Sequence, residues 1–191
     1  EYDAMTAVNS KTAFFFLKEA GKHVNDNGKI CTLVTSLLVL MAFPVLAVGA
    51  ANIAEVQGWG LLRGLHAPFG PALIASLLLL DLTIYGQHVL FHRVPILWRL
   101  HRMHHSDLDF DVTTALRFHP LEIALSMLIK LGLVIALGAP PVAVLLFEVI
   151  LNAAAMFNHA NAALPEKLDR WLRWIVVTPD MHRIHHSVRV E

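Results

Sequence analysis

Long apolar runs alternate with polar segments along this chain. No charged residue occurs between Ile30 and Ala54, a run of 25 residues. A second apolar run extends from Ala67 to about Phe91 and is interrupted only by Asp81. Because about 20 apolar residues are enough for an α-helix to cross a bilayer, both runs are predicted to be membrane-spanning helices.

A third apolar tract, residues 121–157, is divided by the sequence Gly138-Ala139-Pro140-Pro141. A cluster of glycine and proline is a strong turn signal, so the tract is predicted to form a hairpin of two spans of about 17 to 19 residues each. Lys130 and Glu148 lie inside it, and we expect them to pair with each other or to extend toward the membrane surface. The predicted fold is all-α, a multi-pass bundle of about four transmembrane helices.

Composition agrees with a membrane protein. Hydrophobic residues make up 56% of the chain and charged residues 16%, whereas soluble domains carry about 25% charged residues. The net charge of zero argues against a nucleic-acid partner, because phosphate contacts require a basic excess. A single cysteine, Cys31, excludes internal disulfides. The 191 residues are expected to form one membrane-embedded domain, residues 1–191, trimmed at both ends relative to a longer protein.

The placement of positive charge predicts the orientation. Residues 1–29, 92–120 and 164–191 together carry 13 of the 15 lysine and arginine residues. Four spans place these three segments on one side of the membrane, and the positive-inside rule makes that side cytoplasmic.

Histidine is the unusual residue type. Eight of the 12 histidines fall into three tight groups: His88 and His92; His101, His104 and His105; and His182, His185 and His186. On an α-helix, residues i, i+3 and i+4 share one face, so each group is expected to present its imidazoles together. All three groups belong to the side predicted to be cytoplasmic, where they would form a histidine-rich helical cap.

Metal binding explains why so many imidazoles gather at a membrane face. Unpaired polar groups are costly in apolar surroundings, and a metal takes neutral imidazole as a ligand. One octahedral ion accepts about six ligands, so eight or nine histidines indicate two metals. His159, in Phe157-Asn158-His159-Ala160-Asn161, is the candidate ninth ligand, although its spacing leaves the role open.

Several polar residues are predicted to support the ligands. Asp81 and Tyr85 lie on the helical face that carries His88 and His92, so Asp81 is expected to orient a ligand histidine. Three further residues are assigned supporting places: His119 at the start of the third span, Asn161 beside His159, and Asp180. Asp180 follows Thr178 and Pro179, which form a helix start. No catalytic side chain beyond the metal ligands is predicted.

The order of motifs DLTIYGQHVLFH, LWRLHRMHHSD, RFHPLE, FNHANAALP and TPDMHRIHHS resembles the sterol desaturase/fatty acid hydroxylase superfamily. The resemblance covers residues 81–187. It implies two iron ions on the cytoplasmic side, O₂ as co-substrate, and hydroxylation or desaturation of a C–H bond of a membrane lipid. The family's usual continuation beyond the last histidine group is missing here.

Other functions remain compatible with the histidines alone. A membrane di-zinc hydrolase would use the same ligands, and a metal-transport or metal-binding protein is a third class. The sequence contains no cysteine set for an iron–sulfur cluster and no nucleotide fingerprint. An oxygenase of this kind is therefore expected to receive electrons from a separate cytochrome- or ferredoxin-type protein. Nothing in the residues separates hydroxylation from desaturation.

Overall fold

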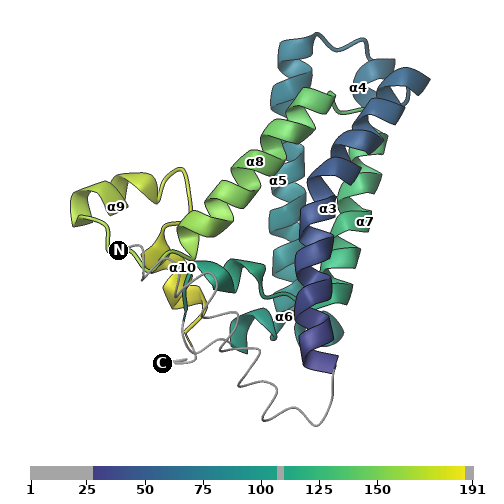
Figure 1. Cartoon of the computed structure of the whole chain (residues 1–191). Coiled ribbons are helices and arrows are strands. Elements are labelled where there is room, and N and C mark those ends of the chain that lie inside the picture. Colours follow the sequence, from purple (N-terminus) through teal and green to yellow (C-terminus); the bar gives the residue numbers. More distant parts are fainter. Residues whose placement is uncertain (1–27, 107–109, 188–191) are drawn as a thin grey trace, which may run out of the picture.

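The computed structural model describes residues 28–106 and 110–187, and Figure 1 shows the chain as a bundle of long helices with several short helices at one end. The N-terminal part of the first basic segment, residues 1–27, lies outside the described residues. Within them every regular element is helical, and this confirms the predicted all-α class.

Four helices form the bundle: α3 (Gly28–Gln57), α5 (Phe69–Arg93), α7 (Pro120–Leu137) and α8 (Pro141–Asn158). Together with the short α4 (Leu61–Gly64), they provide four segments long and apolar enough to cross a membrane. These segments contain 23, 25, 18 and 18 residues. At about 1.5 Å per residue, even the shorter ones approach the hydrocarbon thickness of about 30 Å. The expected multi-pass organisation is confirmed.

The predicted turn between the last two spans is present. Helix α7 ends at Leu137, Gly138 follows in the left-handed conformation with φ 64°, and α8 begins at Pro141. The backbone around Gly60 packs directly on this turn. A Cβ atom on Gly60 would lie 2.0 Å from the backbone nitrogen of Gly138, so only glycine fits there.

The core of the bundle is built from small residues against larger ones. Ala47 and Ala51 of α3 are fully buried and belong to the cluster that contains Leu80, Val134 and Phe147 from the other three long helices. Small side chains allow close helix packing, which is the main source of helix association in lipid. Many large apolar side chains on the outer faces of the spans are exposed, as lipid contact requires.

A buried ion pair connects the last two spans. Lys130 Nζ of α7 donates to Glu148 Oε1 of α8, and both side chains are buried. The Lys130 ammonium also lies 5.7 Å from the centre of the Phe43 ring of α3. Of the two expectations for these charges, pairing is therefore confirmed.

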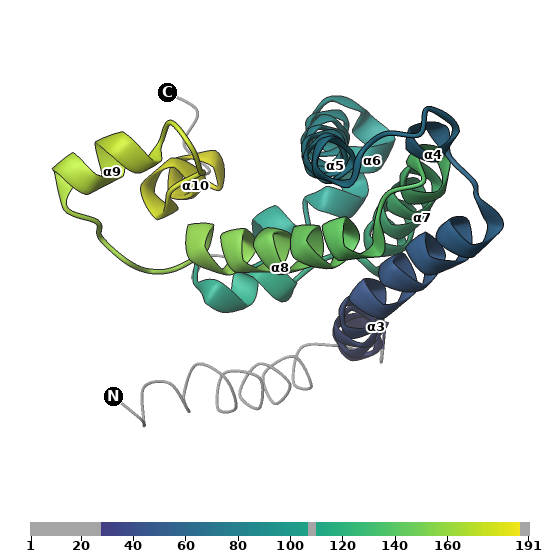
Figure 2. The ribbon, with the colours of Figure 1, turned by 90° about the horizontal axis from the view of Figure 1, so that it is seen from above.

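The short elements other than α4 lie around the end of the bundle where α5 and α8 end and α7 begins, with α9 to the side of α8 (Figures 1 and 2). They are α6 (Pro95–His101), two 3-10 helices (His104–Ser106 and Val112–Leu116), α9 (Glu166–Leu172) and α10 (Pro179–His185). The start of α10 is as predicted, with Thr178 at the N-cap position and Pro179 in the first turn.

One local expectation is right in its outcome and wrong in its geometry. The imidazoles of His101, His104 and His105 lie together, with ring centroids 4.8 to 5.5 Å apart. They do not share a single helical face, because α6 ends at His101 and His104 begins a separate 3-10 helix. The chain turns at Arg102 and Met103, between these two elements.

Candidate metal centre

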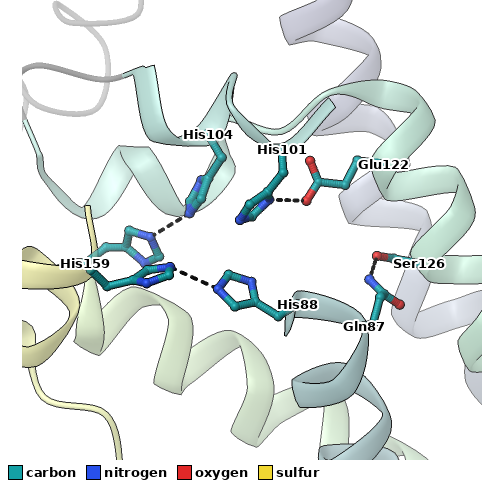
Figure 3. A network of polar contacts seen from close by, with 8 residues as sticks. Gln87, His88, His101, His104, Glu122, Ser126 and His159 are labelled. Carbon is teal, nitrogen blue, oxygen red and sulfur yellow. Dashed lines mark hydrogen bonds and ion pairs between the residues drawn. The ribbon is translucent and has the colours of Figure 1, made fainter. Parts of the chain in front are cut away.

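Nine histidines from five elements converge at this end of the bundle. Eight of them form two sets of four: His88, His92, His101 and His185, which we call set A, and His104, His159, His182 and His186, which we call set B. Within each set, the potential ligand atoms all lie within 4.8 Å of one another. Figure 3 shows members of both sets with their rings directed toward one another.

The elements distribute their histidines between the two sets. Helix α5 supplies His88 and His92 to set A, one helical turn apart. The break after α6 sends His101 to set A and His104 to set B. Helix α10 serves both sets, because His182 and His186 face set B while His185 faces set A.

The distances between ring nitrogens fit shared metal ions. His88 Nε2 lies 3.0 Å from His185 Nε2 in set A. In set B, His159 Nε2 lies 3.2 Å from His104 Nε2 and 3.1 Å from His182 Nε2. With metal–nitrogen bonds of about 2.1 Å, two imidazole ligands lie about 3.0 Å apart at a right angle and about 3.4 Å apart at a tetrahedral angle. The observed spacing falls in or at the edge of this range, so each set could hold an ion.

His159 shows why hydrogen bonding alone does not satisfy set B. Its Nδ1 lies 2.7 Å from the backbone oxygen of Ala155, which can only accept, so Nδ1 carries the proton. In the neutral ring Nε2 is then a bare lone pair. That one lone pair faces two other histidine nitrogens, and a metal ion can engage all three at once. His159, whose role the sequence left open, thus lies at the centre of set B.

Glu122 orients the corresponding ring in set A. Its Oε1 accepts a hydrogen bond from His101 Nδ1 at 2.7 Å, and both side chains are buried (Figure 3). His101 Nε2 is left bare, and it has no hydrogen-bond partner among the described residues. A carboxylate behind a histidine is a common arrangement at metal sites, because it fixes the ring and makes the free nitrogen a better ligand.

Burial favours the neutral form of the histidines that follow the break after α6. Burial, followed by the neighbouring imidazoles, lowers the pKa of His105 and His182 to about 2 and that of His186 to about 3. The same causes hold the pKa of His104 far below its usual value. Imidazoles that stay unprotonated at neutral pH are ready to bind a metal.

His105 lies between the two sets. Its ring stacks on His186 of set B at 4.1 Å between centroids and lies 4.8 Å from both His92 and His185 of set A. Its Nε2 is buried without a hydrogen-bond partner in the described part of the chain. It therefore lies beside both sets without belonging to either of them.

Comparison with known proteins identifies the family. The model of the fatty acid hydroxylase family matches residues 73–191, well over half of the chain. The chain belongs to the fatty acid hydroxylase family. The matched region runs from α5 to the end of the chain and contains all nine clustered histidines, so the resemblance drawn from the motifs is confirmed.

Relatives of this family member include lipid-oxidising enzymes. It is 33% identical to alkylglycerol monooxygenase of Xenopus tropicalis over 56% of this chain and 23% of the relative. It is 29% identical to that of Danio rerio over 90% of this chain and 38% of the relative. Ornithine lipid hydroxylase of Rhizobium tropici is 28% identical over 63% of this chain and 35% of the relative. The chain thus spans well under half the length of each of these relatives. No solved structure matches it.

Aromatic residues that the sequence did not single out surround the histidines. Phe118 stacks on His104, with ring centroids 4.2 Å apart, and Phe110 stacks on His159 at 5.4 Å. Trp98 contacts His92 and His105 at 5.2 and 5.5 Å. These rings restrict the orientation of the imidazoles that they contact.

Asp81 does not occupy the supporting position predicted for it. Its side chain is exposed and it makes no hydrogen bond with any described histidine. The reason is distance: Asp81 shares a helical face with His88, but seven residues separate them by about 10 Å along the axis. Tyr85, predicted beside it, is 65% exposed. The carboxylate that meets a site histidine is Glu122 instead.

The other predicted supporting residues form no hydrogen bond with a histidine of either set in the described structure. His119 caps α7, and its Nδ1 accepts from the backbone N–H of Leu121 at 3.2 Å. Asp180 pairs with Arg183 at 2.8 Å within α10. Asn161 is exposed. His119 therefore caps the helix that carries Glu122, and Asp180 stabilises α10, which carries site histidines.

Proposed function

We propose that this chain is the catalytic domain of an O₂-dependent di-iron lipid hydroxylase. The observation that carries the proposal is the pair of four-histidine sets at one end of a membrane bundle. Family membership supports it, as do the activities in the names of the relatives. We treat residues 1–191 as one domain, because α3 packs against α7 and α8 although it precedes the family match.

The two sets would each hold one iron ion, with His105 between them as a ligand available to either. Bound iron would supply the redox chemistry with O₂ that is needed to break an unactivated C–H bond, which acid–base side chains cannot do. The protein's own contribution is to hold neutral imidazoles in place, through Glu122 behind His101 and the Ala155 carbonyl behind His159.

The substrate is proposed to be a membrane lipid. The relatives' names specify an alkylglycerol and an ornithine lipid as their substrates, and the sets lie where the spans end, within reach of a lipid in the adjoining leaflet (Figure 1). Desaturation is the alternative outcome at the same site, in which the substrate loses a second hydrogen. The names of the relatives favour hydroxylation.

Electrons are proposed to come from a separate cytochrome- or ferredoxin-type protein. The histidine end carries three exposed arginines: Arg93, Arg99 and Arg102. This charge fits an acidic donor and, under the positive-inside rule, a cytoplasmic orientation of the site. Raising the salt concentration is expected to slow turnover with the donor but not with a small chemical reductant.

The arrangement of charges argues against metal transport. A transporter places ionisable ligands along the membrane interior. Within the described spans, the buried Lys130 and Glu148 neutralise each other, and the buried Glu122 lies in the first turn of α7, where it contacts His101. A di-zinc hydrolase would share the ligands. It would differ in needing neither O₂ nor reductant, so the experiment below separates it from the oxygenase.

The test is isotope incorporation. Cells producing the chain, supplied with alkylglycerol or ornithine lipid, are grown under ¹⁸O₂ and their lipids are analysed by mass spectrometry. We expect a hydroxylated lipid with one ¹⁸O atom, absent from a His104→Ala/His185→Ala variant and retained in His66→Asn, a control at an exposed histidine outside the cluster. An alkene without ¹⁸O would establish the desaturase. Lipid cleavage that continues without O₂ would replace the oxygenase with a hydrolase.

A further inference from the structure

The segment that follows the bundle exposes an unusual amount of apolar surface. Trp171, Trp174 and Ile175 are 76%, 86% and 82% exposed. Leu168 and Val177 are exposed as well. We call these five residues the α9 surface. A patch of this kind on a folded protein marks contact with another apolar phase or partner.

The segment is ordered by contacts of its own. Asp169 of α9 is buried and pairs with Arg173, one turn further along. Backbone hydrogen bonds from Ile175 and Val176 to the Leu172 oxygen, 2.9 and 2.8 Å long, continue the turn toward Thr178, the buried N-cap residue of α10. The apolar side chains are therefore presented by an ordered element that leads directly into α10.

The location of α9 indicates what covers this surface. Only residues 159–165 separate it from the end of the span α8. Figure 1 shows α9 projecting sideways from the bundle and running across the direction of the spans, beside the lower part of α8; Figure 2 shows it away from α3 and α7. An element that runs across the direction of the spans at their side fits a position in the plane of the bilayer surface.

The composition of the segment fits the boundary between lipid headgroups and acyl chains. Tryptophan is enriched there because its ring is apolar and its N–H is polar. Leu168 and Trp171 share one face of α9, whereas Glu166, 200° away from Leu168, lies on the other. Lys167 forms no ion pair within the described structure, and it is free to meet a lipid phosphate. Interfacial helices combine an apolar face with basic residues in this way.

We propose that the α9 surface is a membrane anchor, inserted at the headgroup–acyl boundary on the histidine side of the membrane. The anchor fixes the depth of α10, which carries His182, His185 and His186, relative to the lipid. It does not depend on which metal the sets bind or on the reaction catalysed. A second copy of the chain or another protein would be the competing occupant.

Spin labelling distinguishes lipid, water and protein at this surface. Cys31 is the only cysteine, so a Cys31→Ser background allows one label at a time, at Trp171→Cys or, as a second position, Trp174→Cys. Glu166→Cys tests the opposite face of α9. Leu145→Cys, on an exposed position of the span α8, is the lipid reference. The protein is placed in phosphatidylcholine nanodiscs, and label collisions with O₂ and with a water-soluble nickel chelate are measured.

Lipid contact predicts frequent collisions with O₂ and few with the chelate at 171 and 174, as at 145, and the reverse at 166. Frequent chelate collisions at 171 and 174 would place the α9 surface in water and overturn the proposal. Infrequent collisions with both reagents would show that protein covers it, which overturns the proposal equally. The collision rates at 171 and 145 are also compared in detergent and in nanodiscs. Rates that match in detergent and differ in nanodiscs would contradict the proposal, because a lipid anchor must contact the bilayer as the reference position 145 does.

Discussion

Glu122 Oε1 lies 2.7 Å from His101 Nδ1, and this contact joins the first turn of α7 to the last residue of α6. It fixes the proton on Nδ1 and leaves Nε2 of His101 directed into set A without another partner among the described residues. A carboxylate 21 residues away in sequence thus determines which nitrogen is available to a metal.

Removing the charge of Glu122 should weaken the metal in set A. Glu122→Gln keeps an oxygen that accepts the hydrogen bond but removes the negative charge behind the ring, and comparable changes at other sites lower metal affinity by about 10- to 100-fold. Competition with a chelator measures the loss. The matched control, Glu166→Gln, alters an exposed carboxylate on α9. Equal affinities for the two variants would remove Glu122 from the site.

Set A and set B should lose their metals separately. His185→Ala removes a ligand from set A and His182→Ala removes one from set B, although the two residues are only three apart on α10. Each variant is expected to retain about one metal per chain, because four-ligand sites depend on each ligand. Elemental analysis with spectroscopy of the remaining ion checks this. A single histidine whose loss empties both sets would indicate one shared centre.

The metal-free protein should lose stability in acid. Burial lowers the pKa of His182 and His186 to about 2 and 3, whereas in the unfolded chain they titrate near 6.5. Between these values the unfolded state binds more protons, so stability is full above about pH 6.5 and falls as the pH decreases through the window toward 3. Thermal unfolding of the metal-free protein in detergent measures the slope. The double variant His182→Asn/His186→Asn should show a shallower slope, and an unchanged one would contradict the account.

The buried pair between α7 and α8 should tolerate joint but not single replacement. Lys130→Met leaves Glu148 as an uncompensated buried charge, a change that typically costs about 3–5 kcal/mol. Lys130→Met/Glu148→Leu removes both charges and should recover most of that loss. Unfolding in detergent compares the three proteins. If the double variant is as unstable as the single one, the Lys130–Glu148 pair itself contributes to the free energy of unfolding, and the prediction is wrong.

The sequence predicted which histidines lie close together but not how they are distributed between set A and set B. Spacing along α5 and α10 placed His88, His92 and the last histidine group correctly together, and the Gly138 turn brought α7 and α8 side by side as expected. The separation of His101 from His104 depends on a backbone break at Arg102 that has no glycine or proline to signal it.

Tertiary contacts explain the remaining differences. Helical periodicity correctly placed Asp81 on the face of α5 that carries His88. It did not show that Asp81 lies too far from His88 along the helix axis, because a shared face says nothing about that distance. Glu122 is adjacent to no histidine group in sequence, and only the packing of α7 against α6 brings it to His101. His159 acquires its place in set B in the same way, from the end of α8.

The most direct test of the account is the number of iron ions bound per chain. The protein, purified in detergent and loaded with Fe²⁺ without oxygen, is freed of excess iron and analysed beside His104→Ala/His185→Ala, which removes one ligand from each set. Two sets predict about two irons per chain, lost in the variant while the control His66→Asn retains them. No iron in the well-folded protein, or equal iron in the protein and the variant, would contradict the histidine sets as a di-iron centre.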